Sequence, residues 1–281
     1  MDIIEFKQKI KDSSWGTVIR RMAIPYFWSI NKCSDINVFL KRNGIISERK
    51  YNYLKLWKNI HEGERCFVVA TGPSLTFDDL DMLADSGIYC FGMNSCALCL
   101  DKTKWVPSLL GVQDEFVYAK IEDVILREAD GKLKDKIWVS NNVHSLCPSS
   151  RKFKSFKLHY LDHKYNPRGI GALKFSDNCY NVIYDGYSII FSIMQLAVYM
   201  GFKEIYLLGT DCNYNQAKQN FVDNGTKDPN RDIMGNRLIY THLLFKDFAN
   251  SHGVNVVNCT RGGMLEVYPR MKLEDVLEPR I

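Results

Sequence analysis

The stretch Cys66-Phe67-Val68-Val69-Ala70-Thr71-Gly72-Pro73-Ser74 decides the fold of this chain. Five apolar residues come first, and a run of that length predicts a buried β-strand. A turn follows, because Gly72 allows backbone conformations that other residues avoid and Pro73 presets its own φ angle. A helical pattern over Asp78–Ala84 comes next. Strand, polar turn and helix in this order form the opening unit of an α/β sheet.

The same alternation continues to the end of the chain. Further strands are predicted at Ile88–Met93, Leu109–Val112, Ile137–Ser140, Glu204–Leu208 and Val254–Val257. Further helices are predicted at Phe116–Arg127, Tyr187–Met200 and Leu238–Ser251, and the polar stretch from Asn213 to Asn236 is predicted to be a loop. Short strands that alternate with helices imply crossover connections. We therefore expect an α/β, Rossmann-like fold, a mostly parallel sheet with helices on both faces.

The first part of the chain differs from the rest. Residues 1–62 are rich in Lys, Arg, Trp and Tyr and contain no convincing strand, while Val18–Ile24 and Tyr51–Ile60 have helical spacing, interrupted after the first by Pro25. We predict a helical N-terminal extension over residues 1–62 and an α/β domain over residues 63–281. Arg20 to Trp28 mixes basic and aromatic residues, and two interpretations stay open: packing on the main domain, or contact with a membrane surface or partner.

Composition excludes several classes of protein. Apolar residues make up 46% and charged residues 25%, as in a globular domain. The net charge of +5 lacks the clustered basic stripe that nucleic-acid binding requires, so no nucleic-acid partner is expected.

The cysteines and the apolar runs indicate the cellular compartment of the protein. Nine scattered cysteines are typical of free thiols in a reducing cytosol, and the pair Cys96 and Cys99 lacks the second pair of a zinc site. The start of the chain does not resemble a signal peptide, and no apolar run reaches the roughly 18 residues of a membrane span. The expected localisation is cytoplasmic.

Polar residues gather directly after the predicted strands, where ligands of parallel sheets bind. The candidates for nucleotide binding are Thr71, Gly72, Pro73, Ser74, Asn94, Gln113, Asp114, Gly209, Asp211, Asn213 and Tyr214. In the first turn, hydroxyls and free backbone N–H groups can face an anion. Neither a P-loop nor a dinucleotide fingerprint is present. For Asn94, an Asx turn or helix cap is the alternative to ligand contact.

These segments resemble two related groups of proteins. Val68–Leu75, Gly92–Asn94 and Gln195–Asp211 are similar to a bacterial family resembling 6-hydroxymethylpterin diphosphokinase, often found among surface-glycan enzymes, and to small single-domain bacterial sialyltransferases that use CMP-sialic acid. The tail Asn258–Arg270 resembles the first group more closely. The resemblance covers residues 65 to 275 and omits residues 1 to 60.

The sialyltransferase resemblance implies roles by position. Gly72, Pro73 and Ser74 would lie under the phosphate, and Asn94 would contact the CMP portion. Gln113 or Asp114 stands where the relatives have a second Asn. Asn213 or Tyr214 stands where they have a Tyr that supports the departing phosphate. The implied partners are a CMP-sugar donor and a glycan or glycolipid acceptor, with no metal and no cofactor.

One departure concerns the general base. The relatives place a His in an Ile-Gly-His stretch, and the matching stretch here ends in Asn236. An amide does not accept a proton at useful pH. The candidate bases are Asp232 and His242. The alternative for Asp232 is a solvated loop carboxylate without a catalytic role, and the alternative for His242 is an ordinary helix histidine.

The predicted function is therefore a metal-independent glycosyltransferase that uses a CMP-activated, sialic-acid-like sugar in bacterial surface polysaccharide or glycolipid synthesis, with peripheral contact at the inner membrane face. One alternative is an ATP-dependent and Mg²⁺-dependent pyrophosphoryl transferase, for which Asp114 and Asp211 would form the required carboxylate pair. The other alternative is a non-catalytic nucleotide-binding module, which Asn236 suggests because it stands where the relatives have the catalytic His.

Overall fold

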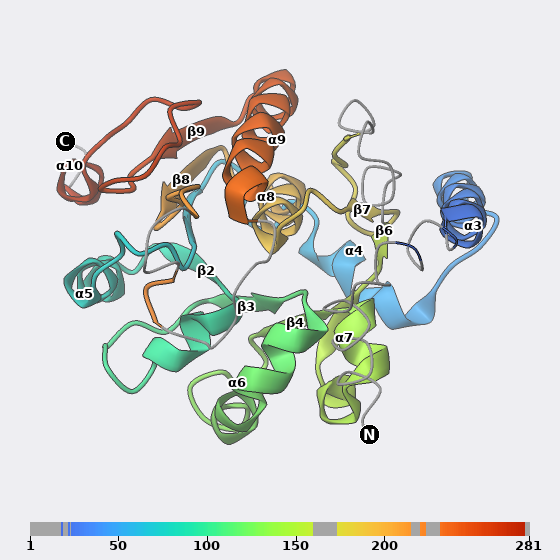
Figure 1. The fold of residues 1–281 in the computed structure, drawn as a ribbon, viewed down its shortest axis with the longest axis horizontal. Coiled ribbons are helices and arrows are strands. Elements are labelled where there is room, and N and C mark those ends of the chain that lie inside the picture. Colours follow the sequence, from blue (N-terminus) through green and yellow to red (C-terminus); the bar gives the residue numbers. More distant parts are fainter. Residues whose placement is uncertain are drawn as a thin grey trace.

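The computed structural model describes Val18, Met22 and residues 24–159, 173–214, 220–222 and 231–278. Within them, seven strands form one sheet in the order β5-β4-β3-β2-β1-β8-β9 (Figure 1). The strands are β1 (Arg65–Val69), β2 (Tyr89–Met93), β3 (Leu109–Val112), β4 (Ile137–Ser140), β5 (Lys154–Phe156), β8 (Glu204–Leu208) and β9 (Asn255–Asn258). Every neighbouring pair is parallel, which confirms the predicted fold class.

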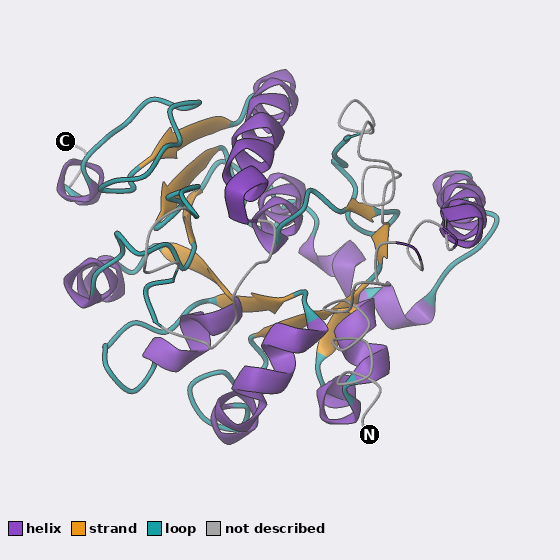
Figure 2. Ribbon diagram, viewed as in Figure 1, coloured by secondary structure: helices purple, strands orange, loops and turns teal. Residues whose placement is uncertain are grey.

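Helices cover both faces of this sheet (Figure 2). The longer ones on the α/β domain are α5 (Phe77–Ser86), α6 (Glu115–Glu128), α8 (Ile189–Met200) and α9 (Arg231–Ser251), and the shorter ones are α7 (Asn141–Leu146) and α10 (Leu273–Leu277). Because side chains alternate along a strand, Cys66 and Val68 of β1 enter the core under α8 and α9. Phe67 and Val69 enter the second core, under α5 and α6.

The strands predicted at Leu109–Val112, Ile137–Ser140 and Glu204–Leu208 have the observed bounds. The prediction for α9 was wrong at its start, since the helix begins at Arg231 rather than Leu238. Its first two turns are polar and were assigned to the loop that precedes them. Gly235 of these turns packs against the loop after β8, because a Cβ there would come 2.5 Å from the Cys212 carbonyl oxygen.

Three short strands were not predicted from the sequence. They are β5 at one edge of the main sheet and the two-stranded sheet of β6 (Leu158–His159) and β7 (Ile183–Tyr184). Segments of two or three residues have no detectable periodicity, so only their pairing partners define them as strands.

The extension contains α3 (Ile24–Arg42), the 3₁₀ turn η1 (Arg49–Tyr51) and α4 (Tyr53–Trp57). Pro25 is the second residue of α3, where its missing N–H needs no partner. Leu54 of α4 is buried in the main core, and the Tyr53 hydroxyl donates to the Ser155 carbonyl. The division of the chain near residue 62 stays a prediction. No described helix combines the length and apolarity needed to cross a bilayer.

Candidate functional site

The candidate site lies where three neighbouring strands end. β1 is central, with β2 on one side and β8 on the other, and Val69 pairs with both Gly92 and Leu208. The three strands therefore end side by side. The loop Thr71–Ser74 after β1 consequently stands between Asn94 after β2 and the segment that begins with Gly209 after β8.

Ser74 and Asp211 join two of these loops. The Ser74 hydroxyl donates to Oδ2 of Asp211 over 2.9 Å. Asp211 is only 4% exposed. Burial raises the pKa of its carboxyl, while the Ser74 hydrogen bonds and the positive charge of Arg270 act in the opposite direction. The carboxylate is thus a buried anchor for the loop after β1.

Glycines let the backbone pack around this carboxylate. A Cβ on Gly72 would lie 1.9 Å from Asp211 Oδ2 and 2.4 Å from the Gly209 carbonyl oxygen. Gly263, in the left-handed region with φ of +82°, would place a Cβ 2.3 Å from the Asp211 carbonyl oxygen, which accepts the N–H of Met264 over 2.7 Å. Gly263 was not among the predicted site residues, although two adjacent glycines after the last predicted strand were a visible signal.

Two positions of the turn after β1 offer no free N–H group. The Gly72 N–H donates to the Gly209 carbonyl over 2.8 Å, and Pro73 has none. The turn also carries two hydroxyls. That of Ser74 donates to Asp211, and that of Thr71 lies 3.4 Å from the Asn220 amide oxygen.

Asn94 presents an oxygen without a partner. Its backbone is left-handed, with φ of +46°, and it is the first residue of the 3₁₀ helix η2 (Asn94–Cys99). The side-chain Oδ1 is buried, and no donor reaches it among the described residues. A buried acceptor left unpaired costs free energy, which a ligand donor at this position would recover.

Gln113 and Asp114 have partners within the protein. The Gln113 amide donates to Asp185 over 3.1 Å and accepts from the Ser192 hydroxyl over 2.8 Å, so it fixes the start of α8. Asp114 caps α6 by accepting the N–H groups of Phe116 and Val117 at 2.8 and 3.0 Å. Sequence analysis did not identify Asp185 or Ser192, because only the folded chain brings them beside Gln113.

The sheet order also separates the two carboxylates proposed as a Mg²⁺ pair. Asp114 follows β3 and Asp211 follows β8, with β2 and β1 between them. Three strand spacings amount to about 14 Å. A single Mg²⁺ binds its oxygen ligands at about 2.1 Å, so these two side chains are not placed to share one ion.

Asn213 and Tyr214 continue the loop after Asp211 and are both half-buried. Cys212, between them and Asp211, has a left-handed backbone with φ of +51° and turns the chain at this point. Tyr214 packs against the core that α8 and α9 cover. Gly209, with φ of +65°, begins the loop.

The three candidate catalytic residues lie on α9 in different environments. His242 is fully buried; its Nδ1 lies 3.1 Å from the Tyr268 hydroxyl, its ring packs on Phe191, and burial lowers its pKa to about 3. A neutral, inaccessible imidazole is suited to a structural role. Asn236 is exposed, next to Gly235. Asp232 belongs to the first turn of α9, and its side chain lies outside the described residues.

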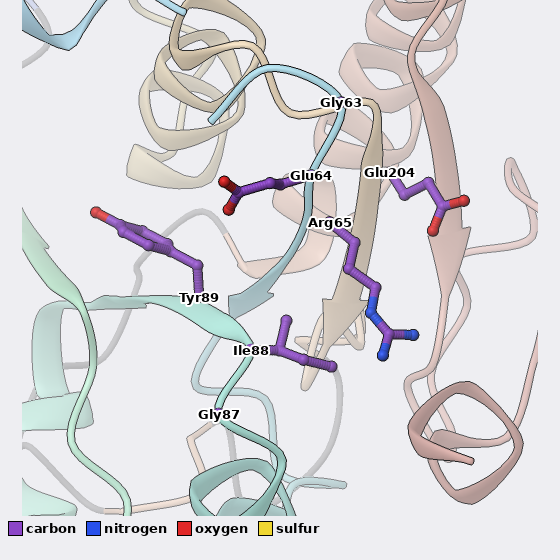
Figure 3. Close-up of a pocket in the computed structure, with 7 residues that line it drawn as sticks. All are labelled: Gly63, Glu64, Arg65, Gly87, Ile88, Tyr89 and Glu204. Atoms are coloured by element: carbon purple, nitrogen blue, oxygen red, sulfur yellow. The ribbon is translucent and has the colours of Figure 1, made fainter. Parts of the chain in front are cut away.

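A cavity of about 360 Å³ lies at the other ends of the strands, away from the candidate site (Figure 3). It lies at the amino ends of β1, β2 and β8, where Glu64, Arg65, Tyr89 and Glu204 surround it. It shares no residue with the strand-end loops above.

Comparison with known proteins places this geometry in context. The model of the family described as 6-hydroxymethylpterin diphosphokinase MptE-like matches residues 43–217. No significant match exists among the curated proteins.

Two solved structures are distantly similar in fold. The MAf glycosyltransferase from Magnetospirillum magneticum AMB-1 has 15% identity and a TM-score of 0.47, over 85% of this chain and 40% of that protein, so the chain spans less than half of its length. The sialyltransferase CstII from Campylobacter jejuni, solved in complex with a substrate analogue, cytidine-5'-monophosphate, has 12% identity and a TM-score of 0.46, over 75% of this chain and 85% of that one.

Proposed function

This chain belongs to the 6-hydroxymethylpterin diphosphokinase MptE-like family, and from that premise we propose that it is a glycosyltransferase whose donor is a CMP-activated acidic sugar. The matched residues include the loop Thr71–Ser74, Asn94 and Asp211, that is, the three strand-end positions that meet beside β1. The product would be a surface polysaccharide or glycolipid.

The buried, unpaired Oδ1 of Asn94 is the observation that carries the proposal. It is an acceptor that awaits a donor, and it flanks a loop in which Gly72 and Ser74 are locked in place by Asp211 and Gly209. The exocyclic amine of cytosine and the ribose hydroxyls are donors of the required kind. The resemblance of the loop and of Gly92–Asn94 to enzymes that use CMP-sialic acid is the reason for choosing CMP among the nucleotides.

The reaction needs little from the protein at the departing phosphate. CMP leaves as a phosphate monoester, which hydroxyl groups such as those of Thr71 and Tyr214 can stabilise without a metal ion. The sugar centre becomes cation-like as the bond breaks. A base must then remove the proton from the acceptor hydroxyl that attacks it.

Asp232 is our proposal for that base. Gly235 of α9 packs on Cys212, so the first turn of α9 runs beside the end of β8. Asp232 lies three residues earlier, and residues three apart share one helix face. A carboxylate is a group that can accept the proton of the acceptor hydroxyl. Asn236, one residue after Gly235 and exposed, would orient the acceptor, and the buried His242 would stabilise the core.

A pyrophosphoryl transferase is the second candidate, favoured by the description of the family itself. It would require Mg²⁺ bound by carboxylates other than the pair Asp114 and Asp211, which the sheet order keeps apart.

Thermal unfolding in the presence of CMP, UDP or ATP, each with and without Mg²⁺, tests the proposal. We expect CMP to raise the melting temperature without Mg²⁺, and sugar transfer from a CMP-activated acidic sugar to be lost in Asp232→Ala but retained in Asp223→Ala. Stabilisation only by ATP with Mg²⁺ would favour the second candidate. If the protein binds a nucleotide but transfers no sugar from any donor, the result would support a non-catalytic nucleotide-binding module.

A further inference from the structure

The helix α3 exposes several large apolar side chains and buries two polar ones. On the inner face, Asn31, Val38 and Lys41 are buried. On the outer face, Trp28, Ile36 and Phe39 are 55%, 59% and 62% exposed. The outer residues follow the spacing i, i+8 and i+11, so they form one stripe along the helix. This distribution is the reverse of that in an ordinary surface helix.

The inner face holds α3 in place mainly through polar contacts. Asn37 accepts from Lys157 over 3.2 Å, Asp35 lies 3.0 Å from His159, and the buried Lys41 forms an ion pair with the half-buried Glu48. Val38 adds a small apolar contact with β7. The helix is therefore docked firmly while its apolar stripe stays uncovered by the described residues. In Figure 1 it lies at the right-hand edge of the molecule, beyond β6 and β7.

The charge of the same region is strongly positive. Residues 1–62 contain 12 Lys and Arg against 6 Asp and Glu, a net charge of +6, whereas the remaining residues contain 25 and 26, a net charge of −1. The positive excess of the protein thus lies entirely in the extension. Two exposed cations, Lys32 and Arg42, belong to α3 itself, and the described extension carries four more, which are Arg49, Lys50, Lys55 and Lys58. Lys32 lies beside the stripe, with its ammonium 5.8 Å from the centre of the Trp28 ring.

We propose that the stripe Trp28, Ile36 and Phe39 of α3 docks the protein on an anionic lipid bilayer. An interfacial helix needs an apolar face with aromatic residues to enter the acyl boundary and cations to meet the anionic head groups. Both are present here on one helix and its surroundings. A second copy of the chain fits the surface less well, because a symmetric pairing would bring two regions of net charge +6 together. The inference is independent of the identity of the donor.

The test compares the full chain with a variant that carries Trp28→Ser, Ile36→Ser and Phe39→Ser in sedimentation with lipid vesicles. Vesicles of phosphatidylcholine with one third phosphatidylglycerol serve as the anionic surface, and pure phosphatidylcholine as the neutral one. The matched control carries Leu243→Ser and Met271→Ser, at positions that are 47% and 44% exposed on other parts of the molecule.

We expect the full chain and the control to bind anionic vesicles at least about ten-fold more strongly than the triple variant. Binding to neutral vesicles should be weaker for all three. A second variant, Lys32→Gln with Arg42→Gln, should lose much of its preference for anionic vesicles while it keeps the apolar stripe.

Equal sedimentation of the triple variant and the control would overturn the proposal. So would a full chain that sediments as a dimer in an ultracentrifuge, dissociates in the triple variant and leaves vesicles unbound, since a second copy would then cover the stripe. The melting temperature shift with CMP is measured on the same proteins. Its persistence in the triple variant separates the membrane surface from the donor site and shows that the variant is folded.

Discussion

The Ser74 hydroxyl lies 2.9 Å from Oδ2 of Asp211, although 137 residues separate the two in the chain. This bond ties the loop after β1 to the end of β8. It also uses the groups that an incoming phosphate would otherwise contact, so the loop is rigid before any ligand arrives. Pre-organisation of this kind reduces the entropy that a ligand must offset on binding.

The Ser74 and Asp211 pair is expected to contribute to stability unequally. Asp211→Ala removes a buried acceptor and leaves the Ser74 hydroxyl without its partner, so it should lower the free energy of unfolding by about 2 to 3 kcal/mol, whereas Ser74→Ala should lower it by about 1 kcal/mol. Urea denaturation measures both. Asp81→Ala is the control, because Asp81 also accepts a hydroxyl and an N–H, from Thr103 and Lys104, but at the surface. An equal loss in Asp81→Ala would contradict the anchoring role.

Gly72 should not tolerate a side chain. In Gly72→Ala the new Cβ would start 1.9 Å from Asp211 Oδ2, so the carboxylate or the loop must move, and we expect a loss of about 3 kcal/mol in the free energy of unfolding together with loss of nucleotide binding. Gly131→Ala, whose Cβ would meet only ordinary contacts at 3.6 Å, is the control and should change stability by less than about 0.5 kcal/mol. Chemical denaturation with and without CMP distinguishes the two effects.

Asn94→Gly separates ligand contact from backbone conformation. Glycine accepts the left-handed φ of +46°, so the variant loses the amide without added strain. We expect the free energy of unfolding to be maintained and the affinity for CMP to fall about ten-fold, as measured by calorimetric titration. Asn59→Gly, at another left-handed position with φ of +56°, should keep its affinity. Unchanged affinity in Asn94→Gly would remove Asn94 from the site.

His242 should make the protein sensitive to acid. Burial lowers its pKa from 6.5 to about 3, so below pH 6.5 the unfolded chain gains a proton that the folded one does not. The stability that depends on the neutral ring is complete above pH 6.5 and is lost as the pH falls toward 3, by about 1.4 kcal/mol per pH unit. His242→Gln should lack this contribution. Its stability relative to the wild type, followed by denaturation between pH 7 and 4, should rise as the pH falls; a constant difference would contradict the assignment.

Particular elements show why some predictions agreed with the structure. The strands Leu109–Val112, Ile137–Ser140 and Glu204–Leu208 are short apolar runs with clear polar ends, and burial on both faces requires such runs. α9 was predicted seven residues too short, because polar turns at Arg231 to Arg237 give no helical periodicity of their own. β5, β6 and β7 consist of two or three residues each, and pairing alone defines them.

For the candidate site, too, some features were predictable from the sequence and others were not. Its location at the ends of β1, β2 and β8 was predictable, because parallel strands carry their ligand loops at one edge. The roles of individual side chains were not predictable. Gln113 and Asp114 follow a strand as ligand-binding residues do, yet one joins Asp185 to Ser192 and the other caps α6. The spacing of residues along a chain does not reveal which donors are already used.

By itself, the sequence determined the parallel α/β sheet and the positions of its ligand loops, since apolar runs, turns and helical periodicity are local properties of the chain. Only the tertiary structure decided that Asp211 would hold Ser74, that His242 would be buried, and that α3 would turn its aromatic residues outward. These outcomes depend on contacts between residues far apart in the sequence. Burial and hydrogen-bond partners are properties of the folded surroundings, and no local pattern contains them.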